Sequence, residues 1–515
     1  DIGLQFWLHP PRGTAKEPPR AERRQQDPDR EHRREVLRKR QIMYLKKLHI
    51  TNFRCFRDYT IEFAPGVTVL FGKNGSGKST LIHAIHKALS MLMYTKNEYA
   101  NALVKGKRKK KLVGYKTITK NNPYLHTKGF SNDDFNNSQD AFIEIAAKAD
   151  FDQNLTNVDW KMSAKTNNNK LRPTEFEDAY LDFYSWQENG GQLPLLVYIS
   201  DGFPHKEDNK KSQVKAKIRE LRNFAYFDWD EEEGCTNEWI IRLENNLKRQ
   251  VALVAKGLVN DNQGIPARAE LKEEDRDEFD TLYRETTSIS ECFERFTSGS
   301  AFDAPFAIKF ERFSLGRNKQ NEGKLCIQAP NGDEYAFRKL PAGYKRLFNI
   351  VLDIAYRSFI LSEGKSTDVA GIAIIDEIDL HLHPMLEQAV LSCLKNTFEN
   401  VQFIVSTHSP LVLAGIETQN GRNSVLKMMP ATNAPEIWPN VYGIDYNQML
   451  EENMEVSKRK PEIQALFNKA WDEVASKDTK AARQTVHHLE QVTPADQIEL
   501  VKLRAIINRI DFMGK

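Results

Sequence analysis

The 515-residue sequence lacks any apolar run close to the roughly 18 residues that a membrane-spanning helix needs. Its best apolar stretch, Val369–Ile375, is short and ends in charged residues. The five cysteines lie far apart and form no Cys-x-x-Cys pair, which argues against a zinc ribbon, a dithiol centre and a disulfide scaffold. We therefore expect a cytoplasmic protein without a membrane segment, in a reducing compartment.

An excess of one charge sign is also missing from most of the chain. The sequence has 74 Lys and Arg against 71 Asp and Glu. Residues 1–42 hold 11 of the basic and 7 of the acidic side chains, which leaves 63 against 64 in the remainder. The net charge of the whole chain therefore says little about whether the protein binds nucleic acid. The Arg- and Pro-rich residues 1–42 contain few core-forming side chains, and we expect a disordered or accessory tail there.

From Met43 onward the sequence has the pattern of an α/β protein. The alternating segments Tyr44–Asn52 and Tyr59–Phe63 predict paired strands, and the short apolar runs Val67–Phe71, Leu193–Ser200 and Ala370–Ile375 predict buried ones. A charged helical pattern without sustained heptads follows over about 206–296. The other expected elements are strands at Ala141–Ala149, Asp159–Ser163, Phe306–Phe313, Lys324–Ala329 and Val401–Ser406, and helices at Ser79–Met93, Glu175–Trp186, Leu347–Leu361, Pro384–Thr397, Pro410–Ala414 and in 445–513.

A glycine-rich loop between the strand at Val67–Phe71 and the following helix fits the phosphate-binding pattern GxxxxGK[ST]. Glycines let successive backbone N–H groups face phosphate oxygens, and the helix directs its positive end at the anion. Lys78 would reach the β- and γ-phosphates of ATP, and the Ser79 hydroxyl would hold Mg²⁺. A chance glycine-rich turn is the weaker alternative in this strand–loop–helix context. The expected ATP-binding residues are Asn74, Gly75, Ser76, Gly77, Lys78, Ser79 and Thr80.

A pair of acids can supply the carboxylate that a phosphate loop needs for its metal ion. The strand Gly371–Ile375 ends directly in Asp376 and Glu377. Two adjacent acids after a buried strand are difficult to explain as solvated surface, although an acidic turn on an edge strand is the alternative. We expect Asp376 to hold Mg²⁺, directly or through water, and Glu377 to act as general base on the attacking water.

Three further motifs follow in the order found in ABC-type ATPases. Leu340-Pro341-Ala342-Gly343-Tyr344-Lys345-Arg346 resembles a divergent ABC signature, Asp379 stands where a D-loop aspartate would, and Ser406-Thr407-His408-Ser409-Pro410 resembles the switch-histidine motif. The opening segment Tyr44–Phe56 and the segment Glu377–Pro384 are similar to those of RecF-like and SMC-like ATPases. Together these segments carry a resemblance to the ABC/SMC-RecF class.

The resemblance implies an α/β fold, an ABC/SMC-RecF-like P-loop ATPase head with a mixed sheet, an inserted helical lobe and a helical C-terminal tail. It also implies two ATP molecules between two head-to-tail protomers, with Ala342, Gly343 and Lys345 of one chain at the nucleotide of the other. Arg54 would lie near the nucleotide, and His408 would bind the γ-phosphate. The expected parts are the tail (1–42), an ATPase lobe with the phosphate loop and a basic insertion (43–205), a helical insertion (206–300), the part with signature, acid pair and switch histidine (301–440) and a helical tail (441–515).

Two positions stay open within this resemblance. A glutamine between sensor and metal is expected in the family, and Gln192 and the turn Ser200-Asp201-Gly202 are both candidates for it. His381 and His383 could suggest a metal site, but they lack a third ligand, so packing in the D-loop is the favoured interpretation.

A nuclease site is not expected in this chain. Asp228-Trp229-Asp230 lies in an acidic run, and His487-His488 has no partner at the spacing of an HNH nuclease. The basic run Lys105–Lys111 has six positive charges in seven residues and is a candidate nucleic-acid contact, with a solvated loop as the alternative.

The overall plan of this sequence, an ATPase without a built-in nuclease, resembles that of the ATPase subunits (PtuA) of Septu-type anti-phage systems over about residues 43–515. These subunits work with a separate HNH nuclease (PtuB), and retron-associated versions stand beside a reverse transcriptase with its DNA–RNA hybrid. The resemblance implies a slow, regulatory ATPase that forms a homodimer or higher oligomer and controls an HNH-type nuclease subunit in antiviral defence. A RecF-like repair ATPase that clamps DNA, and a scaffold that binds ATP with little turnover, are the alternatives.

Overall fold

The structure is a computed structural model, and it divides into two compact units, Asp1–Tyr442 and Gly443–Lys515, which are described separately. The expectations for residues 1–42, Lys105–Lys111, Asp201-Gly202 and the acids Asp228 and Asp230 lie outside the described residues. Apart from a few isolated positions, the described residues are 43–93, 129–136, 142–165, 175–200, 222–227, 235–260, 272–304, 307–316, 322–419, 421–429, 431–439, 441–444, 459–494 and 497–513.

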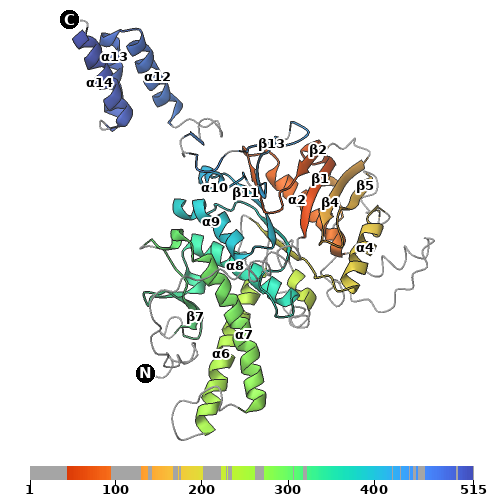
Figure 1. Cartoon of the computed structure of the whole chain (residues 1–515). Coiled ribbons are helices and arrows are strands. Elements are labelled where there is room, and N and C mark those ends of the chain that lie inside the picture. Colours follow the sequence, from red (N-terminus) through yellow and green to blue (C-terminus); the bar gives the residue numbers. More distant parts are fainter. Residues whose placement is uncertain are drawn as a thin grey trace, which may run out of the picture. The chain divides into compact units, whose positions relative to one another are not determined.

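A six-stranded sheet with the order β13-β12-β3-β11-β10-β6 forms the centre of the first unit (Figure 1). All neighbours are parallel except β13, which pairs antiparallel with β12, so the sheet is mixed as predicted. Strands β3, β6, β10 and β11 are buried along their whole length, which explains their nearly continuous apolar sequences. The strands are β3 (Val67–Phe71), β6 (Leu195–Ile199), β10 (Gly371–Ile375), β11 (Val401–Thr407), β12 (Asn423–Lys427) and β13 (Glu436–Ile437).

A second, antiparallel sheet has the order β2-β1-β4-β5, which confirms the predicted pairing of the first two strands. Helix α2 (Lys78–Leu89) packs on β1, β4 and β5. The indole Nε1 of Trp160 in β5 donates to the Ala88 carbonyl at 2.9 Å, near the end of α2. This sheet therefore holds the helix that follows the phosphate loop. Its strands are β1 (Tyr44–Phe53), β2 (Phe56–Glu62), β4 (Phe142–Asp150) and β5 (Val158–Lys165).

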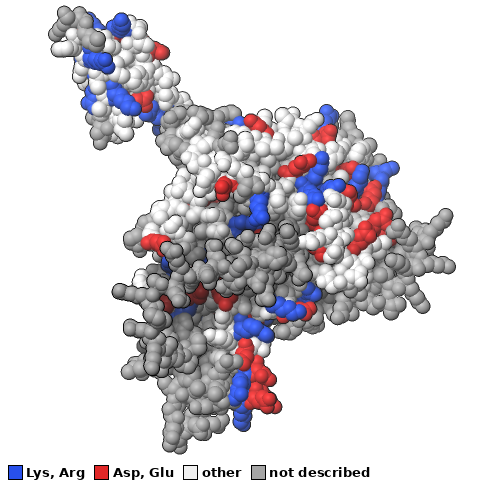
Figure 2. All heavy atoms as spheres, viewed as in Figure 1, with Lys and Arg blue, Asp and Glu red and all other residues white. Residues whose placement is uncertain are grey.

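Helices α6 (Thr236–Asn260) and α7 (Glu273–Phe296) form a hairpin that packs on the long buried helix α8 (Ala342–Leu361) (Figure 1). Buried polar contacts hold this attachment. The Trp239 indole donates to Asp353 at 2.6 Å, and Asp353 also pairs with Arg357 at 2.8 Å. Figure 2 shows acidic and basic side chains side by side on the hairpin surface, as expected for a solvated face.

The remaining elements of the first unit include a small third sheet, further helices and several 3-10 turns. A small antiparallel sheet has the order β7-β8-β9, with a turn at Asn331-Gly332 between its last two strands. The elements are α4 (Glu177–Glu188), β7 (Arg312–Leu315), β8 (Leu325–Gln328), β9 (Glu334–Ala336), α9 (Pro384–Thr397), α10 (Pro410–Ala414) and the 3-10 turns at Ser90–Met93, Asn132–Asp134, Arg222–Tyr226, Ser300–Phe302 and Phe337–Lys339.

The described residues of the second unit include the helices α12 (Pro461–Ala475), α13 (Thr479–Val492) and α14 (Ile498–Met513). Apolar side chains from all three helices, among them Phe467, Leu489 and Leu503, form a core of their own. This matches the amphipathic helices expected at the C-terminal end. Within the described parts of both units, no helix has the length and apolarity needed to cross a membrane.

Candidate nucleotide-binding site

The segments with the predicted motifs meet at one edge of the main sheet. Phe71 pairs with Thr407, and Ile375 pairs with both Val405 and Ile199 in parallel registers. Parallel strands send their carboxyl ends to the same edge. The phosphate loop after β3, the acids after β10 and the switch histidine after β11 therefore leave the sheet side by side.

The phosphate loop has the backbone that its glycines predict. Gly77 lies at φ 93° at the start of α2, and a Cβ there would stand 2.6 Å from Cζ of Phe56 and 3.1 Å from Sγ of Cys55. A side chain at this position would therefore be both strained and obstructed. The Lys78 ammonium is buried and donates to the Gly72 carbonyl at 3.0 Å, inside the curve of the loop.

The loop contains a buried polar atom that suits an anion. The Ser76 hydroxyl is 7% exposed and has no hydrogen-bond partner among the described residues. A buried hydroxyl without a partner is costly, and a phosphate oxygen would satisfy it. Ser79 is exposed at the first turn of α2, so its side chain is accessible to a metal ion. These residues fit a nucleoside triphosphate with Mg²⁺.

The carboxylates of three nearby acids affect the pKa of Lys78. Burial lowers the pKa of Lys78, while Asp376, Glu377 and Asp379 raise it, and burial has the larger effect. The acid pair and the phosphate-loop lysine therefore share one electrostatic environment. Such a mixture of a buried cation and acids is what a phosphate with a divalent cation requires.

Ser406 at the end of β11 holds both residues of the acid pair. Its hydroxyl donates to Oδ1 of Asp376 and accepts from the Glu377 amide at 2.8 Å. Asp376 is 8% exposed, and its amide donates to the Ile199 carbonyl at 2.8 Å. Ser406 is part of the predicted switch-histidine motif, but its role in holding the acid pair was not predicted.

The switch-histidine segment is joined to the D-loop. Oδ1 of Asp379 accepts from the Thr407 hydroxyl at 2.5 Å and from the His408 amide at 3.4 Å. His408 is half-buried beside these contacts. Asp379 therefore fixes the backbone that presents His408 at the carboxyl edge of the sheet.

The two histidines of the D-loop have structural contacts. The ring of His383 accepts from the Met385 amide at 3.4 Å and caps α9. His381 adopts φ 65° and offers its carbonyl to the approach of Gly343. These contacts agree with packing rather than with a metal site.

The signature segment forms the first turn of α8. Ala342 is exposed there, and Lys345 is half-buried. A Cβ on Gly343 would lie 2.5 Å from the His381 carbonyl oxygen, so only glycine allows this close approach to the D-loop. Within its own chain, the signature segment therefore contacts the D-loop at Gly343 and the acid pair through Arg346, whose Nη2 donates to the Asp376 carbonyl at 2.7 Å.

Arg54 lies in a turn beside the phosphate loop. Its Nε donates to Oδ1 of Asp134 at 3.0 Å, and Lys87 of α2 pairs with the same carboxylate at 3.0 Å. Burial alone would raise the pKa of Asp134, but the Ser131 amide, Lys87 and Arg54 together lower it. Asp134 therefore holds the Arg54 turn against α2, which the sequence did not predict. Contact of Arg54 with a nucleotide stays a prediction.

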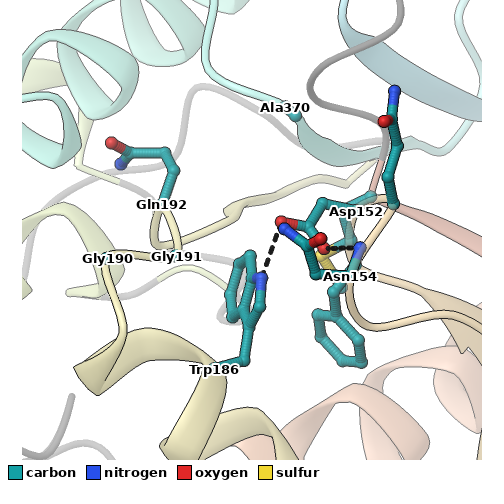
Figure 3. Close-up of a pocket in the computed structure, with 10 residues that line it drawn as sticks. Asp152, Asn154, Trp186, Gly190, Gly191, Gln192 and Ala370 are labelled. Atoms are coloured by element: carbon teal, nitrogen blue, oxygen red, sulfur yellow. Dashed lines mark hydrogen bonds between the residues drawn. The ribbon is translucent and has the colours of Figure 1, made fainter.

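The candidate glutamine Gln192 lies at the wrong edge of the sheet. It precedes β6, and because β6 and β10 are parallel, this edge is opposite to Asp376. Its amide donates to the Leu361 carbonyl at 3.0 Å and lines a cavity of about 330 Å³ with Asp152 and Trp186 (Figure 3). The strand direction therefore excludes Gln192 as a residue at the metal. Ser200, which follows β6, lies at the correct edge.

The fold and this site define an ABC-type ATPase head. Residues 44–428 match the RecF/RecN/SMC N terminal domain family, and the chain belongs to this family. This match confirms the predicted ABC/SMC-RecF-like head.

Individual proteins show which members of the family this chain is similar to. The Retron Ec83 probable ATPase of Escherichia coli is 26% identical over 502 residues, which cover 90% of this chain and 86% of that protein. The Septu protein PtuA of Bacillus mycoides (strain KBAB4) is 40% identical over 77 residues, or 15% of this chain and 11% of that protein. An Smc head domain with an extended coiled coil from Pyrococcus furiosus is 17% identical and covers 80% of this chain and 98% of its own, with a TM-score of 0.38. The relatives confirm the predicted resemblance to PtuA-like ATPases of the Septu and retron group.

Proposed function

We propose that this chain is a cytoplasmic ATPase that binds and slowly hydrolyses ATP between two head-to-tail copies and thereby regulates a separate nuclease in antiviral defence. The observation that carries the ATPase part is the meeting of phosphate loop, acid pair and switch histidine at one edge of the main sheet. Each of these segments supplies a different need of phosphoryl transfer, namely phosphate binding, metal binding and water activation.

The residues divide this work in the following way. Backbone N–H groups of the phosphate loop, Lys78 and the Ser76 hydroxyl hold the phosphates, and Ser79 and Asp376 hold Mg²⁺. The metal ion neutralises charge on the phosphate oxygens when it is bound. Glu377 accepts the proton of the attacking water, and His408 binds the γ-phosphate.

The second copy completes the site with its signature segment. Ala342 is exposed at the start of α8, where a helix N-terminus presents backbone N–H groups to an anion. The γ-phosphate on one chain would meet Ala342, Gly343 and Lys345 of the other, so ATP joins the two copies and its hydrolysis releases them.

The regulatory part of the proposal is supported by the likeness to the Retron Ec83 probable ATPase along most of the chain. The partner would be an HNH nuclease subunit of the PtuB kind, and a retron-associated version would add a reverse transcriptase with its DNA–RNA hybrid. Lys105–Lys111 is the segment we assign to contact with nucleic acid.

Replacement of Glu377 tests the ATPase part. Glu377→Gln should retain ATP binding, lose hydrolysis by about 100-fold or more, and accumulate as an ATP-dependent dimer in light scattering. The matched control is Glu399→Gln. Glu399 is an acid that precedes β11 at the opposite edge of the sheet, so this variant should behave like wild type. The proposal fails if wild type shows no turnover and Glu377→Gln has the same mass with and without ATP.

Purification from native cells tests the partner. Tagged wild type and Glu377→Gln should each recover a small HNH protein, and the variant shows which nucleotide state holds the complex. Recovery of DNA alone with a clean dimer would contradict nuclease regulation and favour a DNA-clamping repair ATPase.

A further inference from the structure

A buried arginine joins the signature segment to the acid pair of the same chain. Arg346 lies in the first turns of α8, three residues after Gly343, and is 2% exposed. Its Nη2 donates to the carbonyls of Asp376 at 2.7 Å and Glu377 at 3.2 Å, and its Nη1 donates to the Ser200 carbonyl at 3.1 Å. One guanidinium therefore connects the carboxyl ends of β6 and β10 to α8.

These bonds fall on the backbone that orients Glu377. Glu377 adopts φ 49°, a region that costs a non-glycine residue about 1–3 kcal/mol and persists only when neighbouring groups enforce it. Arg346 binds the carbonyl of the Asp376–Glu377 peptide and the carbonyl of Glu377 itself, while Ser406 accepts from the Glu377 amide, so the backbone on both sides of the Glu377 Cα is held. The direction of the Glu377 side chain therefore depends on where Arg346 lies.

We propose that Arg346 is a positioning residue that transmits engagement of the signature segment to Glu377 of the same chain. This inference rests on the proposed head-to-tail dimer, in which the signature of a chain meets the partner's ATP while Glu377 acts on the chain's own ATP. Arg346 then links the two nucleotide sites. Gly343 at the start of the same helix also lies close to the His381 carbonyl of the D-loop, so α8 contacts the segment that follows Glu377 at a second point.

The same helix offers a matched control. Arg357 is 1% exposed and donates to the carbonyls of Ala225 at 2.6 Å and Phe227 at 3.0 Å, while its Nε pairs with Asp353. It is thus a buried arginine of α8 with backbone partners, but these partners lie toward the helical insertion. A purely structural role of Arg346 predicts that Arg346→Lys and Arg357→Lys have similar effects on activity.

Steady-state kinetics separate positioning from stability. Lysine keeps the charge but cannot span three carbonyls, so Arg346→Lys should lower kcat about 100-fold with little change in KM or in binding of a fluorescent ATP analogue. Arg357→Lys should lower the unfolding temperature at least as much and leave kcat nearly unchanged. If Arg346→Lys does not fold, Arg346→Gln, which retains an amide donor without a buried charge, takes its place with the same expected outcome.

Mixed dimers locate the effect. One protomer carries Glu377→Gln, so that only the other hydrolyses ATP, and Arg346→Lys is placed on either protomer. Loss of activity only when Arg346→Lys is on the hydrolysing protomer supports the proposal. Loss only in the other arrangement, equal loss in both, or loss in neither overturns it. An inactive mixed dimer with both arginines intact would instead contradict the proposed function and, with it, the setting in which Arg346 acts.

Discussion

Ser406→Ala is the substitution whose effect the structure defines most closely. Ser406 is fully buried, and its hydroxyl both donates to the Asp376 carboxylate and accepts from the Glu377 amide. A hydrogen bond to a charged group is worth about 1.5–3 kcal/mol, and an amide left without a partner in a half-buried position costs about 1 kcal/mol. We therefore expect the free energy of unfolding to fall by about 3 kcal/mol.

The matched control for this experiment is Ser358→Ala. Ser358 is also fully buried, but its hydroxyl has no hydrogen-bond partner among the described residues. Its removal should leave the free energy of unfolding within about 0.5 kcal/mol of wild type or raise it slightly. Urea unfolding of the two variants measures the difference.

The rate of ATP hydrolysis is a second measure of the effect of Ser406→Ala. Without the hydroxyl, Asp376 and Glu377 lose the group that holds them in one orientation, so kcat should fall by about 10-fold to 100-fold. Ser358→Ala should retain the wild-type rate. Equal unfolding energies and equal rates for the two variants would refute the assignment of Ser406 as the support of the acid pair.

Three further predictions concern other parts of the first unit. Asp353→Asn breaks the buried pair with Arg357 and should cost about 3–5 kcal/mol in urea unfolding, whereas Asp303→Asn, whose lysine pair is exposed, should cost less than about 1 kcal/mol. Burial lowers the pKa of Lys395 to about 8, so the folded state releases this proton first and the unfolding energy should rise between pH 8 and 10.5; a pH series in which Lys395→Met has the same slope would contradict this. Cys55 is exposed with its Sγ against the position of Gly77, so maleimide treatment should weaken ATP binding in wild type and leave Cys55→Ser unaffected. Equal ATP affinities before and after labelling of wild type would show that the Cys55 turn does not border the phosphate site.

The sequence was sufficient wherever local spacing dictates geometry. The phosphate loop needs a strand before it and a helix after it, and both lie within a few residues of Lys78. The acids after Gly371–Ile375 are likewise placed by the end of their own strand. Because all these strands are parallel, their carboxyl ends meet without further information.

Residues that act through distant contacts could not be predicted. Arg346 and Ser406 bind Asp376 across a separation of 30 residues, and Arg54 binds Asp134 across 80. No spacing rule connects such positions, because the contacts exist only after the strands and α8 have packed. The direction of β6, however, follows from a parallel sheet. It places Gln192, which precedes the strand, at the edge opposite to Asp376, and it could therefore have excluded Gln192 as a residue at the metal ion.

Boundaries differed from the predictions for identifiable reasons. Helix α8 begins at Ala342 rather than Leu347, because Pro341 occupies its N-cap and the signature forms its first turn. Strand β12 was not predicted, since only Val425 and Leu426 of its five residues are buried. Its place is set by pairing with β3, which no local pattern in Asn423–Lys427 indicates.

A mixing experiment tests the shared nucleotide site most directly. Lys78→Ala removes the phosphate-loop lysine, and Ala342→Glu places a negative charge at the exposed start of α8, where it would repel a partner's γ-phosphate. Each variant alone should be inactive. A mixture should recover activity above that of either variant, up to a limit of about a quarter of the wild-type rate, since half of the dimers hold one intact site. The hydrolysing protomer of such a dimer has a blocked signature segment of its own, so the coupling proposed for Arg346 keeps the rate below that limit. A mixture that forms dimers with ATP but stays as inactive as its components would contradict a site built from the phosphate loop of one chain and the signature of the other.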